Sequence, residues 1–166
     1  MTKVTYIFMD FDGVTHPWGE VEDFRCLPLI ESVVREYEEA RIVIASDWRI
    51  LFSLAKLVNR FAEDIRPRIA GVTPHLIPKH GSELHGLRER EAMAWLGQHV
   101  PDIGVARWCA LDDAPGNWLT RSRLLLTDFK RGFTDEDAGA LRRVLDGFRA
   151  GTSVPVAPPP SFLRRA

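Results

Sequence analysis

The chain has 166 residues and a formal net charge of −1, with 45% hydrophobic and 27% charged residues. This length and composition are typical of a single globular domain that buries a core of its own. The near-neutral charge gives no support to tight, nonspecific binding of nucleic acid. No apolar stretch is long enough to span a bilayer, and residues 1–4 run into a predicted strand instead of a signal peptide. With only two cysteines, Cys26 and Cys109, no disulfide framework is expected, and we expect a cytoplasmic protein.

Short apolar runs alternate with amphipathic helical stretches, which is typical of an α/β fold with a mainly parallel sheet. Five strands are predicted, at Val4–Met9, Arg41–Ala45, Arg68–Val72, Val105–Leu111 and Arg123–Thr127. Four helices carry their apolar positions within Leu29–Tyr37, Leu51–Phe61, Met93–Leu96 and Leu141–Phe148. We therefore expect a Rossmann-like three-layer sandwich around a five-stranded sheet, in one domain over residues 1–150.

Local signals mark the ends of some of these elements. Pro28 suits the first turn of the first helix, and Thr134 suits the N-cap of the last. Residues 151–166 are rich in proline and predict an extended C-terminal extension, which could serve as a docking segment for a partner protein.

The sequence Asp10-Phe11-Asp12-Gly13-Val14 follows the first predicted strand directly. Residues i and i+2 of an extended chain point the same way, so Asp10 and Asp12 begin on one side, and Gly13 permits a sharp turn after them. A motif of this kind alone also occurs in calcium-binding loops. Ser46 ends the second strand, however, and Asp112-Asp113 follows the fourth. Since ligands of parallel sheets bind at the carboxyl ends of the strands, we expect these clusters to share one crevice.

Together these segments resemble the signatures of the haloacid dehalogenase superfamily. Within this superfamily, the chain is similar to compact domains found in bacterial and phage proteins. Some of these domains are attached to multi-domain RNA-repair proteins. The intervals between the signatures are too short for a substantial cap domain, so the resemblance implies a fold with no large cap. The segments that carry it are Phe8–Pro17, Ile44–Arg49, Gly71–Pro74, Arg88–Leu96, Leu111–Asp113 and Gly132–Thr134.

The resemblance implies a Mg²⁺-dependent phosphatase. In the superfamily, an acid at the position of Asp12 distinguishes phosphatases and phosphotransferases from dehalogenases and transport ATPases. Asp10 is then the nucleophile that forms an aspartyl-phosphate, Asp12 the general acid and base, and Ser46 a ligand of the phosphoryl oxygen. Mg²⁺ would take a side-chain oxygen of Asp10, the backbone carbonyl of Asp12, and a further contact from Asp112 or Asp113.

The basic residue that balances the phosphate charge is open among Lys79, Arg88 and Arg90. We favour Arg88 because it opens the helix that leads into the fourth strand, and an arginine there can grip phosphate with two donors. A lysine would be the more familiar superfamily residue. The alternative for Arg88 and Arg90 is a solvated, charged helix end.

Six residues are predicted to contact the substrate, namely Ser46, Asp47, Arg49, Arg88, His16 and Trp18. Trp18 could stack on a nucleobase, although ordinary loop packing is the alternative. Without a cap, the site should be open, which favours a nucleotide or a nucleic-acid phosphate end over a small enclosed metabolite. The competing hypothesis is a noncatalytic phosphate-binding or regulatory module on the same fold.

Overall fold

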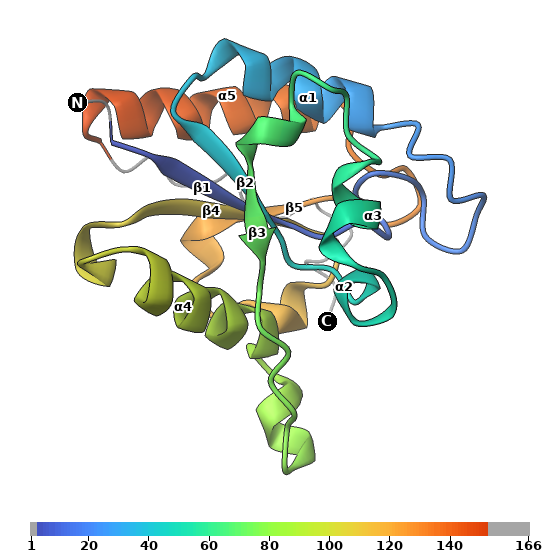
Figure 1. Ribbon diagram of the computed structural model, residues 1–166, viewed down its shortest axis with the longest axis vertical. Helices are drawn as coiled ribbons and strands as arrows, with labels where there is room; N and C mark the ends of the chain where they lie inside the picture. The colour runs from blue at the N-terminus through green and yellow to red at the C-terminus, as the bar shows by residue number, and fades with distance from the viewer. Residues whose placement is uncertain (1–2, 153–166) are drawn as a thin grey trace.

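A computed structural model describes residues 3–152, and its centre is one parallel five-stranded sheet (Figure 1). The order of the strands in the sheet is β3-β2-β1-β4-β5. Each predicted strand is present, with ends shifted by one or two residues, so the predicted fold class is confirmed. The strands are β1 (Thr5–Met9), β2 (Ala40–Ile44), β3 (Ile69–Val72), β4 (Arg107–Asp112) and β5 (Leu124–Leu126).

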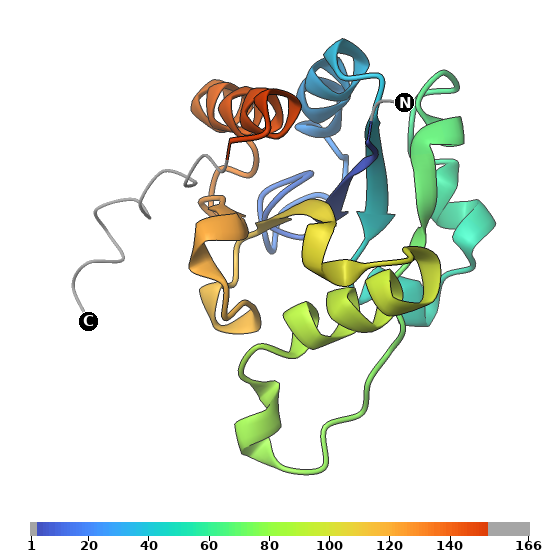
Figure 2. The ribbon, with the colours of Figure 1, turned by 90° about the vertical axis from the view of Figure 1, so that its left-hand side faces the viewer.

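Helices cover both faces of the sheet and complete the three layers. Helices α1 (Leu27–Glu36) and α5 (Asp135–Ala150) lie side by side on one face, and α4 (Leu87–His99) covers the other (Figures 1 and 2). Side chains alternate between the faces along each strand, so Ile7 and Met9 join the core under α1 and α5, whereas Phe8 joins the core under α4. Within the described residues, five single 3₁₀ turns lie at Arg66–Arg68, Gly81–Leu84, Ile103–Val105, Pro115–Asn117 and Arg121–Arg123.

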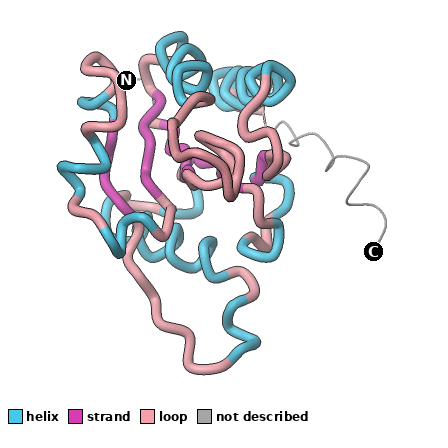
Figure 3. The backbone as a smooth tube through the Cα atoms, turned by 90° about the vertical axis from the view of Figure 1, so that its right-hand side faces the viewer, coloured by secondary structure: helices cyan, strands magenta, loops and turns pink. Residues whose placement is uncertain are grey.

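The order of the strands fixes where a ligand would bind. From β1 the chain builds outwards through β2 and β3, and then crosses to the other side of β1 to form β4 and β5. The direction of winding therefore reverses between β1 and β4, and a crevice forms outside their carboxyl ends. Figure 3 faces this edge and shows the loops that gather there.

The prediction of one continuous second helix is wrong. The structure has two short helices, α2 (Trp48–Leu51) and α3 (Leu54–Val58), separated by extended backbone at Phe52. The reason is Ser53, whose hydroxyl accepts a hydrogen bond from the backbone N–H of Lys56 and caps a new helix. As a result Leu51 and Leu54 are exposed instead of buried.

The last helix follows its prediction closely. The hydroxyl of Thr134 accepts a hydrogen bond from the backbone N–H of Asp137, and the carboxylate of Asp137 accepts one from the backbone N–H of Thr134. The two bonds form a capping box at the start of α5. Leu141, Val144 and Leu145 are buried against the sheet.

No cap domain is present within residues 3–152. The excursion of residues 73–86, between β3 and α4, extends away from the sheet beside the start of α4 (Figure 2). None of the described helices is both long enough and apolar enough to cross a membrane. The proline-rich extension predicted from residue 151 lies outside the described residues from residue 153 onwards.

Candidate active site

Three carboxylates meet at the edge between β1 and β4. Asp10 follows β1, and Asp112 ends β4 with Asp113 next to it. The two strands are in register, and the backbone N–H of Asp10 donates to the carbonyl of Leu111. One oxygen from each of the three carboxylates lies within 4.8 Å of the others. Among residues 3–152, this is the one group of three or more His, Cys, Asp or Glu residues whose ligand atoms lie close enough together to hold a metal ion.

Burial and mutual repulsion disfavour three negative charges at this place. Burial, with repulsion from Asp112, raises the pKa of Asp10 to about 8, although Arg88 and the backbone N–H of Phe11 oppose the shift. Burial likewise raises the pKa of Asp112 and of Asp113 to about 6. Such a cluster is stable in its charged form when a cation neutralises it, and an all-oxygen donor set of this kind fits Mg²⁺.

Asp112 is held rigidly by groups that the sequence did not reveal. Its Oδ1 accepts the backbone N–H of Ala114 at 2.8 Å, and its Oδ2 accepts the indole N–H of Trp118 at 2.8 Å. The amide of Asn117 lies 3.5 Å from the same Oδ2. Nothing in the sequence pattern marks Trp118 and Asn117, because they reach back to Asp112 through an irregular 3₁₀ turn.

Gly13 is required at its position for two reasons. Its φ of +74° lies in the left-handed region that favours glycine. In addition, a Cβ atom at this place would lie 2.5 Å from Cγ of Asp113, which is far inside van der Waals contact. The glycine after Asp12 therefore makes room for the carboxylate that arrives from β4.

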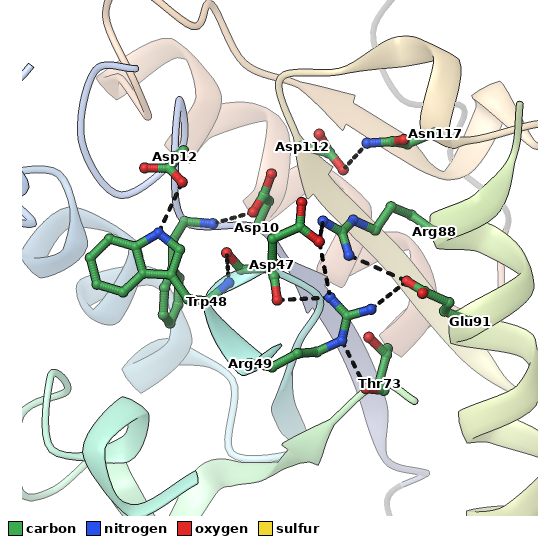
Figure 4. Close-up of polar contacts among 12 residues, drawn as sticks. Asp10, Asp12, Asp47, Trp48, Arg49, Thr73, Arg88, Glu91, Asp112 and Asn117 are labelled. Atoms are coloured by element: carbon green, nitrogen blue, oxygen red, sulfur yellow. Dashed lines mark hydrogen bonds and ion pairs between the residues drawn. The ribbon is translucent and has the colours of Figure 1, made fainter. Parts of the chain in front are cut away.

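Asp12 has surroundings different from those of Asp10. Its Oδ1 lies 2.9 Å from Nε2 of His16. Its Oδ2 accepts the indole N–H of Trp48 at 2.9 Å (Figure 4). The side chain is 36% exposed, so it faces solvent at the mouth of the site. His16, which is predicted to lie at the entrance, is completely buried and holds Asp12, and its contact with a substrate stays a prediction.

Ser46 lies between Asp10 and the start of α2. It is buried, and the interaction of its hydroxyl with Asp10 lowers the pKa of that carboxyl. The hydroxyl also lies 3.4 Å from the backbone nitrogen of Trp48. Ser46 thus faces the acidic cluster and contacts the first turn of the helix at the same time.

Arg49, which is predicted to bind substrate, makes polar contacts within the protein, and its contact with a substrate stays a prediction. Its side chain is 2% exposed, and its donors are used inside the protein (Figure 4). Nε donates to the carbonyl of Thr73, and Nη1 donates to the carbonyl of Ser46. Nη2 donates to the carbonyl of Pro74 and lies 2.6 Å from Glu91. Arg49 therefore ties the loop after β2 to the loop after β3.

Among the three basic candidates, Arg88 lies at the site. Its Nη2 lies 2.9 Å from Oδ1 of Asp47, and it acts electrostatically on Asp10. Lys79 is exposed on the excursion of residues 73–86, and Arg90 donates to the carbonyls of Glu83 and His85 in the same segment. The alternative of a solvated helix end is wrong for Arg88, which is buried.

Two glutamates of α4 were missed by the sequence reasoning. Glu91 is fully buried and accepts from Arg49, from Arg88 and from the backbone N–H of Leu76. Glu89 accepts from the backbone N–H groups of residues 119 and 120 and so holds the loop that carries Trp118. The spacing of Arg88 and Glu91, three residues apart on one helix face, was the available signal.

Trp18 lies apart from the buried cluster. Its side chain is 63% exposed, and its backbone N–H donates to the carbonyl of Phe129 in the loop after β5. Phe129 is also exposed, so two aromatic side chains flank the edge of the sheet. Contact of Trp18 with a substrate stays a prediction.

A parallel sheet of this order, with an acidic cluster where β1 meets β4, a hydroxyl after β2 and a cation at the start of α4, defines a haloacid dehalogenase (HAD) domain. Over residues 6–138 the chain matches the family of the HAD domain in Swiss Army Knife RNA repair proteins, and it belongs to this family. The resemblance inferred from the sequence is thereby confirmed. No curated protein and no solved structure gave a match.

Proposed function

We propose that this domain is a Mg²⁺-dependent phosphomonoesterase that acts through an aspartyl-phosphate. The observation that carries the proposal is the different environment of two neighbouring carboxylates. Asp10 is partly buried beside Asp112, Asp113 and Arg88, whereas the side chain of Asp12 is 36% exposed and is held by hydrogen bonds to His16 and Trp48. Two carboxylates in distinct surroundings can take distinct roles in one reaction.

In the proposed reaction, an oxygen of Asp10 attacks phosphorus and the bond to the leaving oxygen breaks. The backbone N–H of Phe11 donates to Oδ1 of Asp10 at 2.7 Å and fixes the orientation of the nucleophile. Ser46 and Arg88 offer donors to the phosphoryl oxygens, where developing charge is stabilised.

Asp12 is the proposed general acid and base. It would protonate the leaving oxygen, and in the second step it would take a proton from the water that releases phosphate from Asp10. His16 and Trp48 hold both of its oxygens, and its exposure gives it access to the leaving group and to water.

Mg²⁺ is the proposed cofactor, with the carboxylates of Asp10, Asp112 and Asp113 and the backbone carbonyl of Asp12 as its protein ligands. When bound, it would neutralise the cluster and offset negative charge on the phosphoryl group. The Asp12 side chain points instead to His16 and Trp48, which leaves its carbonyl as the group of that residue available to the metal.

The proposed substrate is a nucleotide or the phosphate end of a nucleic acid. The absence of a cap domain within residues 3–152 supports a substrate that is not enclosed. The family contains domains of RNA-repair proteins, which also supports this class.

The test uses p-nitrophenyl phosphate and a nucleoside monophosphate, each with Mg²⁺ and with chelator. We expect turnover by the wild-type protein with Mg²⁺ only, and loss of turnover in Asp10→Asn. Asp12→Asn should slow the nucleotide much more than the aryl phosphate, because the aryl leaving group needs less protonation. Phosphate binding without any wild-type turnover would instead indicate the noncatalytic module.

A further inference from the structure

A second pocket adjoins the site on the other side of Trp48. Trp48 donates its indole N–H to Asp12 and also forms a wall of this pocket, so one side chain separates the two places. The pocket encloses about 300 Å³ and is lined by Trp48, Phe52, Lys56, Leu57, Asn59 and Arg60.

The lining of the pocket is electropositive. It contains two cations and an amide but no acidic side chain. Within residues 3–152, neither Lys56 nor Arg60 forms an ion pair, whereas Arg49 and Arg88 are both paired with carboxylates. In a chain of net charge −1, two unpaired cations in one concave place favour an anionic ligand.

Arg60 is held in position by aromatic rings. Its guanidinium carbon lies 5.1 Å from the ring centre of Phe24 and 5.5 Å from that of Trp48. Cation–π contacts of this kind orient a guanidinium and leave its N–H donors available to a ligand. A planar group with free donors is well suited to binding phosphate through two hydrogen bonds.

A further surface pocket is a weaker candidate for an anion. It lies between the loops after β1 and β5, and it combines three cations with three acids, namely Arg25, Lys130, Arg131, Glu20, Asp135 and Glu136. Charges of both signs cancel there, so the pocket beside Trp48 is the better anion site.

We propose that the pocket beside Trp48 binds a second phosphate group of the substrate, namely the phosphodiester next to the terminal phosphate that is hydrolysed. This inference rests on the proposed function and defines its substrate as a strand rather than a single nucleotide. The two places are adjacent, because the indole of Trp48 donates to Asp12 and also lines the pocket. Phe52, which is 38% exposed at the rim, offers a ring on which the neighbouring base can stack.

The experiment compares substrates with one and with two phosphate groups. The first are p-nitrophenyl phosphate and a nucleoside monophosphate, and the second are a dinucleotide with a terminal phosphate and a nucleoside bisphosphate. The proteins are the wild type, Lys56→Ala, Arg60→Ala and the control Arg121→Ala, whose arginine is exposed and does not line the pocket.

Loss of one charge-assisted hydrogen bond should lower the ratio of kcat/KM for the dinucleotide to kcat/KM for the mononucleotide about tenfold, mainly through KM. This is expected for Lys56→Ala and for Arg60→Ala, and not for Arg121→Ala. If the two substitutions lower kcat/KM for the dinucleotide but not for the bisphosphate, the substrate is a strand. If they lower kcat/KM for the bisphosphate but not for the dinucleotide, the assignment to a phosphodiester is overturned. If Arg60→Ala fails to fold because its stacking is lost, Lys56→Ala decides the test.

The two proposals fail in different ways. An unchanged ratio in both variants, with an active wild type, overturns the second-phosphate site and leaves the phosphatase proposal intact. If the wild type turns over no substrate, the phosphatase proposal fails, and calorimetric binding of the dinucleotide and mononucleotide decides the inference. In that case, equal dinucleotide affinity in all proteins overturns it, and weaker affinity in the two pocket variants supports it.

Discussion

Asp47 and Arg88 form an ion pair at the mouth of the site, with 2.9 Å between Oδ1 of Asp47 and Nη2 of Arg88. Asp47 precedes α2, yet its side chain makes no capping hydrogen bond. The Asp47 carboxylate is 74% exposed, while the Arg88 side chain is 9% exposed. The exposed carboxylate of Asp47 thus occupies the guanidinium of Arg88, which we propose to bind the substrate phosphate.

The first prediction is that Asp47→Asn strengthens phosphate binding. Removal of the competing charge leaves Arg88 free for an external anion, and an exposed pair of this kind contributes up to about 1 kcal/mol, or roughly fivefold in affinity. The inhibition constant of inorganic phosphate should therefore fall several-fold. Glu22→Gln, which neutralises an exposed acid of the β1–α1 loop, is the matched control. An unchanged or higher inhibition constant in Asp47→Asn would show that Asp47 does not compete with phosphate.

The second prediction concerns pH and metal. The pKa of Asp10 is raised from its ordinary value of 3.8 to about 8, and those of Asp112 and Asp113 are raised to about 6. The folded protein therefore holds these protons more tightly than the unfolded chain. Their contribution to stability is full below the ordinary value and is lost as the pH rises through about 6 to 8.

Mg²⁺ should restore the stability that is lost, because it neutralises the charged carboxylates. We expect it to raise Tm more at about pH 8 than at about pH 5. Thermal unfolding in chelator and in Mg²⁺ at both pH values measures this difference. A shift in Tm that is equal at the two pH values contradicts the prediction.

The third prediction compares two glycines with nearly the same φ angle. Gly13 has φ +74° and Gly19 has φ +75°, but a Cβ atom would meet Asp113 at Gly13 and no atom within 4 Å at Gly19. Gly19→Ala should cost about 1 kcal/mol through backbone strain alone. Gly13→Ala should cost more and should also raise the Mg²⁺ concentration needed for half-maximal activity, because it displaces Asp113. Equal effects of the two substitutions on the metal requirement would argue against this role of Gly13.

The fourth prediction concerns Glu91, which pairs with Arg49 and Arg88 in the interior. Glu91→Gln removes the buried counter-charge of Arg49 and leaves Arg88 with only the exposed Asp47, so the free energy of unfolding should fall by about 3 kcal/mol. Urea denaturation measures this loss, with the exposed substitution Glu63→Gln as control, for which we expect less than about 0.5 kcal/mol. If both substitutions proved equally mild, Glu91 would not be the anchor of the two arginines.

The fold and the acidic part of the site could be read from the sequence. Apolar runs of strand length fixed the five strands, and parallel strands bring their carboxyl ends to one edge, so residues that follow them must meet there. This argument placed Asp10, Ser46 and Asp112 together without any coordinates. The requirement for Gly13 was also visible, since an acidic turn needs a residue that accepts positive φ.

The tertiary structure alone decided which charged and aromatic side chains serve these residues. A charged stretch at the start of a helix has the same sequence pattern whether it faces solvent or the interior, so the burial of Arg88 and Glu91 depended on packing against the loops after β2 and β3. Trp118 reaches Asp112, and Trp48 separates Asp12 from the cationic pocket, through contacts between segments far apart in the chain. Local periodicity reports which face of an element is apolar, whereas the partner of each polar side chain is set by how the elements pack.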